Sequence, residues 1–465
     1  MVASDIIEHF FKWLARTATG LVLGILIFVG LRRPKRPAGV FPKEVLILGG
    51  YGYGNTGDEA QLGANLTRWR AVRPRIELVV ASPHPDYTAD HHGCRSRAAS
   101  RAVFFRSNDA SHYNLSNPWF RITFWPTLIR RELNARLMAP GLAAGFASAA
   151  DASFLATLQN AAAVHVSGGG FLTGPTRSRL WDTCLVLRLC RHLGTPYFLT
   201  GQTVGIFQTA ADRWLARTAL RRALGISLRD PGGSERELAA LGVPADRMRS
   251  LFDDALFCDR AADETVDTVL AASGIDRGQR FVAVNYHWWG MDQATRDAAD
   301  KRMAETLDAL KAQIDAPVVF VPMVPHDTEA QRRVIARMQR PARILAYDYD
   351  YRAVRGVIAR AEVLLSFKHH PLIFAIGERT PCLSISFDPY YHRKNIGAMT
   401  NFGLDRFCID RDGFMGGALR QRLDDLLADR DAIRTRLCAD LKAADAAQGA
   451  FFDDCVRKTG LATTG

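Results

Sequence analysis

EVLILGGYGYGNTGDEA, residues 44–60, is the stretch that decides the fold. The apolar run Val45–Leu48 predicts a buried strand and Glu59–Trp69 predicts a helix, with the glycines in the turn between them. A turn of this kind presents backbone N–H groups at the start of a helix, where ligands commonly bind. The stretch therefore predicts an α/β protein with a ligand site at this turn.

The segment GYGNTG, residues 52–57, fits the dinucleotide-binding pattern GxGxxG, but its surroundings do not. A dinucleotide site needs an acidic residue at the end of the second strand, and the strand predicted at Ile76–Ala81 ends without one. No Lys-Ser or Lys-Thr follows the glycines, which excludes a Walker loop. Because Asp58 would repel a phosphate placed at the helix start, a hydroxyl-rich ligand such as a sugar fits better. Asn55 and Asp58 would then bind the sugar; the alternative is that both only cap the helix.

Two further glycine segments follow predicted strands in the same half of the chain. VSGGGFLTG, residues 166–174, follows the strand predicted at Ala163–Val166, and TGQTVGIF, residues 200–207, continues the strand predicted at Tyr197–Thr200. Glycine lets a ligand approach the backbone closely, so three such loops at successive strand ends predict a lined cleft. The residues that we expect to contact an acceptor molecule there are Asn55, Gly57, Gly169, Gly170 and Gln202.

The strand-like runs fall into two series separated by a linking segment. The first ends with Gly225–Leu228, and the second begins with FVAVNYH, residues 281–287. Short strands that alternate with helices predict parallel sheets covered on both faces. We therefore predict two doubly wound, Rossmann-like α/β domains that face each other across a cleft. The predicted parts are an N-terminal anchor and linker at 1–40, domains at 41–265 and 275–415, and a helical tail at 416–465.

The second series carries the densest group of reactive side chains, LLSFKHHPLIFAIGERTP at residues 364–381. An apolar strand ends there and a helix is predicted at Pro371–Gly377, which places a cation and imidazoles at a helix N-terminus. Such groups can grip a phosphate or carboxylate and pass protons near neutral pH. If the chain is extended, Lys368 and His370 face the same side, and His369 points away as a packed histidine.

A basic stretch with aromatic rings, FDPYYHRKN at residues 387–395, follows the next predicted strand. It places Asp388, Arg393 and Lys394 at a strand end opposite the glycine loops of the first half. We expect these side chains to bind the same ligand as Lys368; the alternative is a solvated surface loop.

The composition bounds the class of protein. With 48% apolar and 23% charged residues in 465, the chain can build two cores and does not have the composition of a disordered chain. The formal net charge of +12 is scattered, so it favours an anionic substrate or a negative membrane surface and gives no support for nucleic acid. Eight cysteines without a CxxC pair or a Cys/His metal spacing predict free thiols in a reducing compartment and no metal site.

The N-terminus contains an uncharged segment, TATGLVLGILIFVGL at residues 17–31, followed by a basic cluster that begins at Arg32. The segment is short for a full span, which needs roughly 20 apolar residues. It predicts a short membrane anchor or a helix that lies in the membrane interface; the alternative is a helix packed on the soluble body. The basic cluster would keep the body in the cytoplasm, so we expect the cytoplasmic face of the inner membrane or the cytoplasm.

An ordered set of short motifs resembles the polysaccharide pyruvyl transferase family from about Glu44 to Arg420. Lys368 stands where that family usually carries Arg, and a lysine is a point charge rather than a planar fork. The matching segments are GNTGDEA at 54–60, GGG at 168–170, GQTVG at 201–205, Arg229-Asp230, Asp253 or Asp254, KHHPLIFA at 368–375 and FDPY at 387–390.

The resemblance implies a GT-B-like fold and transfer of a pyruvyl group, as a ketal, from phosphoenolpyruvate (PEP) to a sugar of a cell-envelope or exopolysaccharide precursor. The acceptor would be a saccharide or a lipid-linked saccharide, and PEP would be a co-substrate with no further cofactor or metal. His370 would donate a proton and Asp58 would orient or deprotonate the acceptor. Lys368, Arg393 and Lys394 would hold the phosphate and carboxylate of the donor, with Asp388 on the same side.

Two other functions remain open at this stage. A nucleotide-sugar glycosyltransferase of the same architecture would use the basic cluster to hold a diphosphate. A non-catalytic, membrane-associated sugar-binding member of the family would fit the replacement of Arg by Lys368.

Overall fold

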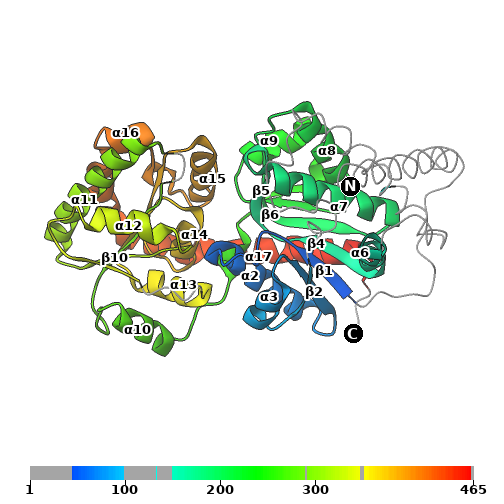
Figure 1. Cartoon of the computed structure of the whole chain (residues 1–465), viewed down its shortest axis with the longest axis horizontal. Coiled ribbons are helices and arrows are strands. Elements are labelled where there is room, and N and C mark those ends of the chain that lie inside the picture. Colours follow the sequence, from blue (N-terminus) through cyan, green and yellow to red (C-terminus); the bar gives the residue numbers. More distant parts are fainter. Residues whose placement is uncertain (1–43, 99–131, 133–148, 289–290, 346–349, 462–465) are drawn as a thin grey trace, which may run out of the picture.

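The computed structural model describes residues 44–98, 132, 149–288, 291–345 and 350–461. The predicted anchor at residues 17–31 lies outside these ranges. Figure 1 shows two α/β domains side by side, joined by the long helix α17. Among the described residues, no helix is both long and apolar enough to cross a membrane.

The first domain is built on a parallel sheet in the order β3-β2-β1-β4-β6-β7-β8, with β5 paired to β6. Alternate residues of β1 point to opposite faces, so Leu46 enters one hydrophobic cluster and Ile47 the other. Both faces are therefore covered, which explains why the inner strands β1, β2 and β4 are nearly continuous apolar runs, whereas the edge strands β3 and β8 are not. The strands are β1 (Glu44–Leu48), β2 (Glu77–Ser82), β3 (Arg95–Ala98), β4 (Ala161–Val166), β5 (Gly169–Thr173), β6 (Tyr197–Gly205), β7 (Ile226–Leu228) and β8 (Met248–Ser250).

The helices of the first domain begin and end at recognisable caps. The Asn55 side chain accepts a hydrogen bond at the start of α2, and the left-handed Gly194 ends α7. At α8 the Thr209 hydroxyl and the Asp212 carboxylate form a capping box. The helices are α2 (Thr56–Val72), α3 (Pro85–His92), α6 (Ala149–Asn160), α7 (Arg177–Leu193), α8 (Ala210–Leu220) and α9 (Gly233–Ala240).

The second domain is built on a parallel sheet in the order β11-β10-β9-β12-β13-β14. The strands are β9 (Val282–Asn285), β10 (Val318–Phe320), β11 (Ala342–Ile344), β12 (Val363–Ser366), β13 (Cys382–Ser386) and β14 (Cys408–Asp410). Its helices are α10 (Asp263–Ala272), α11 (Gln293–Ile314), α12 (Asp327–Ile335), α13 (Tyr351–Arg360), α14 (His369–Gly377), α15 (Pro389–Thr400) and α16 (Arg411–Met415). The predicted fold of two doubly wound domains is confirmed.

Helix α17 (Ala418–Lys458) belongs to both domains. Leu423 and Leu426 near its start pack into the core of the second domain, whereas Phe452 and Val456 near its end pack into the core of the first. Gln448 reaches the seam between the domains, where its side-chain amide donates to Asp254 at 2.8 Å. The tail therefore ties the two domains together.

Candidate active site

The candidate site is a cavity of about 170 Å³ between the two domains, where the carboxyl ends of strands from both sheets meet. Ligands of doubly wound folds bind at this edge of the sheet. The first domain contributes Asn55, Asp58, Gly170, Phe171, Thr176, Arg179 and Arg229 to its lining. The second domain contributes Met323, Lys368, His369, His370, Pro371, Tyr390, Tyr391 and Lys394.

The glycine turn after β1 forms one wall of the cavity. Asn55 caps α2 by accepting a hydrogen bond from the Gly57 backbone N–H at 3.1 Å, and it also lines the cavity. Asp58 lies in the first turn of α2, and its burial raises the pKa of its carboxyl to about 6 although Arg179 opposes the shift. A side chain at Gly57 would overlap the ring of His370, so the glycine allows the two domains to approach here.

The opposite wall is the start of α14, which begins two residues earlier than the helix predicted from the sequence. Lys368 is the N-cap residue, and the helix begins at His369 rather than at Pro371. The alternation expected of an extended chain therefore does not apply, and Lys368, His369 and His370 all line the cavity. The Lys368 ammonium forms an ion pair with the buried Asp327 at 2.7 Å, while burial lowers the pKa of this lysine.

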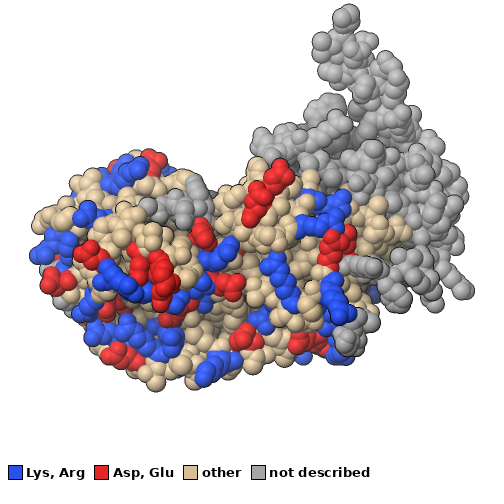
Figure 2. All heavy atoms as spheres, turned by 90° about the horizontal axis from the view of Figure 1, so that it is seen from below, with Lys and Arg blue, Asp and Glu red and all other residues tan. Residues whose placement is uncertain are grey.

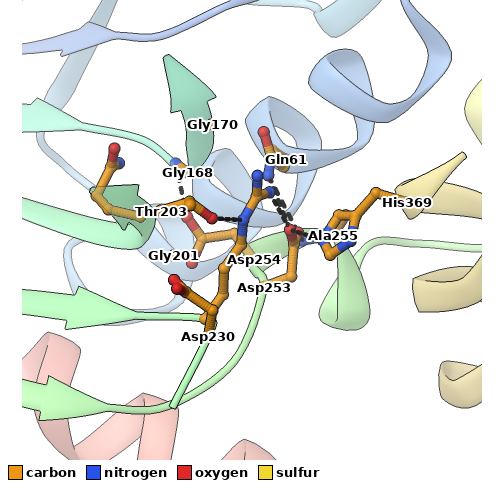
Figure 3. Close-up of polar contacts among 12 residues, drawn as sticks. Gln61, Gly168, Gly170, Gly201, Thr203, Asp230, Asp253, Asp254, Ala255 and His369 are labelled. Carbon is orange, nitrogen blue, oxygen red and sulfur yellow. Dashed lines mark hydrogen bonds and ion pairs between the residues drawn. The ribbon is translucent and has the colours of Figure 1, made fainter. Parts of the chain in front are cut away.

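The two histidines differ in their partners. His369 is buried, and one ring nitrogen lies 3.2 Å from Asp253 (Figure 3). The other ring nitrogen lies 3.1 Å from Asn395, so His369 is a packed histidine as well as a lining residue. Burial lowers the pKa of His369 to about 4. His370 has a buried Nε2 atom with no hydrogen-bond partner, and burial lowers its pKa well below the usual value. Without a bound anion both rings are neutral at pH 7.

Lys394 on α15 has an unusual environment for a cation. Its Nζ lies 3.9 Å from the centre of the Tyr391 ring and 4.9 Å from that of Tyr390, a cation–π arrangement. Burial, with a further contribution from Arg229, lowers the pKa of Lys394 to about 7. The Tyr390 hydroxyl donates to the Gly170 carbonyl at 2.9 Å and so connects the two walls.

Arg229 and Asp253 form a buried ion pair at the floor of the cavity. The Arg229 guanidinium also donates to Thr203 at 2.9 Å, and it holds the pKa of Asp253 well below its usual range. Among the described residues, the other two lining cations, Arg179 and Lys394, form no ion pair with a carboxylate. The cavity thus presents four cations and one lining carboxylate, an arrangement suited to a small anion.

Five residues predicted to bind ligand do not line this cavity: Gly57, which abuts the His370 ring, and Gly169, Gln202, Asp388 and Arg393. Gln202 is buried and its side-chain amide donates to backbone carbonyls of the first sheet. Gly169 packs against the Phe171 ring, and the Asp388 carboxylate caps α15. Arg393 pairs with Asp230 at 3.3 Å and lines a separate open groove of about 560 Å³. These residues were predicted because they follow strands, and they do lie near the seam between the domains. The position of a residue at a strand end does not determine the direction of its side chain.

The sequence analysis missed several lining residues. Arg179 lies within α7, outside any motif, so no signal in the sequence marked it. Arg229, which lines the cavity, and its buried partner Asp253 entered only through the family resemblance, and their pairing depends on the tertiary structure. Among the described residues, no group of three or more His, Cys, Asp or Glu is arranged to hold a metal ion.

Comparison with known families identifies the family of this chain. The family described as Polysaccharide pyruvyl transferase matches residues 55–389. The chain belongs to this family. The matched region contains both walls of the cavity up to the start of α15, while Tyr390 and Lys394 follow directly after it. No curated protein matches the sequence significantly.

Solved structures similar to this polysaccharide pyruvyl transferase family member share its fold at low sequence identity. A glycosyltransferase from Rickettsia africae ESF-5 has a TM-score of 0.50 and 11% identity, and the match covers 88% of this chain and 99% of that one. A putative UDP-N-acetylglucosamine 2-epimerase from Listeria monocytogenes has a TM-score of 0.52 and 13% identity, covering 87% and 94%. The S. aureus MnaA–UDP co-structure has a TM-score of 0.51 and 10% identity, covering 85% and 90%. The two domains therefore adopt the GT-B arrangement, as predicted.

Proposed function

We propose that this protein transfers a pyruvyl group from PEP to a sugar of a cell-envelope or exopolysaccharide precursor, free or lipid-linked, and forms a ketal. The observation that carries this proposal is the seam cavity, in which Arg179 and Lys394 lack carboxylate partners among the described residues and burial raises the pKa of Asp58 to about 6. The site is small, cationic and equipped for proton transfer, which suits a compact anionic donor. Membership of the family supports the same reaction.

The chemistry needs a proton source, a base and anion-binding groups, and no resident cofactor. Protonation of the PEP methylene carbon places positive charge on the adjacent carbon, which one sugar hydroxyl attacks. The bond between that carbon and the phosphate oxygen then breaks, and a second hydroxyl attacks the same carbon to close the ketal. The two hydroxyls release two protons: one replaces the proton taken up by the methylene carbon, and the other leaves on hydrogen phosphate.

The cations of both walls would hold the donor. Lys394 and Arg179 have no carboxylate to release before they bind, so they are the first candidates for its phosphate and carboxylate groups. Lys368 would keep its ion pair with Asp327 and also attract the donor, so that its ammonium lies between two anions. A lysine, as a point charge, can do this where the family usually has arginine. In this assignment Arg393 and Asp388 support the fold of α15 rather than the donor.

Proton transfer would depend on donor binding. His370 is neutral in the free site, and a phosphate beside its Nε2 would raise its pKa and let it become the proton donor. Lys394, whose pKa is already about 7, is the second candidate for this role. Asp58 is mostly ionised at pH 7 and lies on the wall expected to face the sugar, so it would act as the base for an acceptor hydroxyl.

The direct test is product release from the purified full-length protein. PEP with a panel of sugar glycosides should give acceptor-dependent release of phosphate, and the His370→Gln variant should not. Release of nucleotide from UDP- or GDP-sugars, without phosphate release from PEP, would identify a glycosyltransferase instead. If neither donor reacts and PEP does not raise the thermal unfolding midpoint, the protein is a non-catalytic member of the family.

A further inference from the structure

We infer that the outer face of helix α8 is a docking surface for an anionic lipid membrane. The exposed residues on this helix and its C-terminal turn carry charge of one sign: Arg213, Arg217, Arg221 and Arg222 are all exposed. The only acidic residue between 210 and 222 is Asp212, which is fully buried. It accepts hydrogen bonds from Trp181 and from the α8 capping box, so it does not screen the arginines.

The arginines form a stripe, because Arg213, Arg217 and Arg221 are spaced by four residues and share one side of the helix. Like charges at this spacing repel and weaken a helix, although Arg221 and Arg222 at its end interact favourably with the helix dipole. Among the described residues, none of these four arginines forms an ion pair with a carboxylate. An external anionic partner would remove this repulsion.

Helix α17 carries its arginines in a different arrangement. There the exposed arginines alternate with acidic residues and form ion pairs along the helix, such as Arg420–Asp424 at 3.2 Å and Arg434–Asp431 at 3.4 Å. On the face of the molecule seen in Figure 2, basic and acidic residues are likewise interspersed over both domains. The concentration of one charge on α8 is therefore a local feature.

An exposed tryptophan identifies the partner more closely. Trp214 lies beside the arginine stripe with 39% of its surface exposed, and it is one of two large apolar side chains exposed among the described residues. The buried Arg188 guanidinium lies 4.4 Å from the centre of its ring and holds it in place. Tryptophan favours the boundary between lipid chains and headgroups, and arginine binds lipid phosphates. A convex helix face with both residue types fits a lipid surface.

The test is flotation of full-length protein with vesicles of phosphatidylcholine alone or mixed with phosphatidylglycerol. Wild type should bind the anionic vesicles, and salt should weaken the binding. Each basic residue near an anionic surface strengthens partitioning about fivefold. Because four such factors multiply, the quadruple variant Arg213→Gln/Arg217→Gln/Arg221→Gln/Arg222→Gln should lose on the order of several hundredfold in partitioning.

The matched control removes the same charge from α17, through Arg420→Gln, Arg422→Gln, Arg430→Gln and Arg434→Gln. It should bind as wild type does. All variants keep residues 1–43, so any contribution of that segment is common to them. Equal loss in the control would show that only net charge matters and would overturn the assignment to α8. Unchanged binding of the α8 variant would overturn it too, as would stripe-dependent binding to heparin or nucleic acid without binding to vesicles.

Discussion

Two groups of charged residues lie together in the seam between the domains, and they differ in how completely they are bonded. Asp253 and Asp254 lie beneath the cavity and accept hydrogen bonds from both domains and from α17. Arg179 and Lys394 line the cavity and contact aromatic rings, but among the described residues no carboxylate pairs with them. Fully bonded charges hold the domains in place, whereas charges without a counter-ion are available to a ligand.

The largest effect among the variants that test this difference is expected at His370, as a loss of turnover. His370→Gln keeps a polar group at the cavity but cannot deliver a proton, so turnover should fall by roughly 10²–10⁴ while donor affinity changes little. Steady-state kinetics with PEP measures both. His369→Gln cannot serve as a neutral control, because His369 forms hydrogen bonds with Asp253 and Asn395. This variant should lower the free energy of unfolding more than it lowers turnover. If His370→Gln turns over at a rate near that of wild type, the role of proton donor is assigned to Lys394 instead.

Asp58 should produce a comparable loss with a distinct pH signature. Its carboxyl must be ionised to accept a proton, so kcat/KM should rise with pH through about 6, the pKa that burial gives it. Asp58→Asn should lower turnover by roughly 10²–10⁴ and remove this rising limb from the pH–rate profile. A rising limb that persists in the variant would assign it to another group.

Asp253 tests the bonded group. Asp253→Asn leaves the Arg229 guanidinium buried without its counter-ion, so the free energy of unfolding should fall by about 3–5 kcal/mol. Asp254→Asn is the matched change at the neighbouring residue, whose partners are the uncharged donors of Thr200, Asn65, Gly168 and Gln448. It should cost less, about 1–3 kcal/mol. Denaturant unfolding measures both, and the reverse ranking would contradict the role given to the ion pair.

Lys394 tests the unpaired group. Lys394→Met should weaken PEP binding by about 1.5–3 kcal/mol, the range for a charged hydrogen bond. The fold lowers the pKa of Lys394 to about 7, so the unfolded chain binds more protons between about pH 7 and 10 and wild-type stability should rise with pH there. That rise should be smaller in the variant. Arg393→Met, one residue away but paired with Asp230, should bind PEP as wild type does; calorimetric titration compares the two.

The smallest effect is expected at Tyr390. Tyr390→Phe removes the hydrogen bond from its hydroxyl to the Gly170 carbonyl, which also accepts from Thr173. The free energy of unfolding should therefore fall by only about 0.5–1.5 kcal/mol. A larger loss in a thermal unfolding series would mean that this one contact holds the two walls together.

The fold was predictable because strands buried on both faces leave continuous apolar runs, and such runs appear at β1, β4, β12 and β13. The sequence also marked Asn55, Asp58, Gly170, Lys368, His370 and Lys394, all of which line the cavity. Side-chain direction and pairing were not predictable. Arg393 follows the same strand as Lys394 but turns to Asp230, and Arg179 comes from a helix that carries no motif. These outcomes depend on contacts between segments far apart in the chain.

Helix α17 has a consequence for how the protein is made. Phe452, Cys455 and Val456 complete a hydrophobic cluster of the first domain, together with residues of β1 and α2. Domains generally fold during synthesis from the N-terminus onward. Here the first domain lacks part of its core until Phe452, Cys455 and Val456, which follow the whole second domain in the sequence, have left the ribosome. The first domain therefore completes its core only after the second domain has been synthesised, and apolar surface around β1 stays exposed until the end of α17 follows.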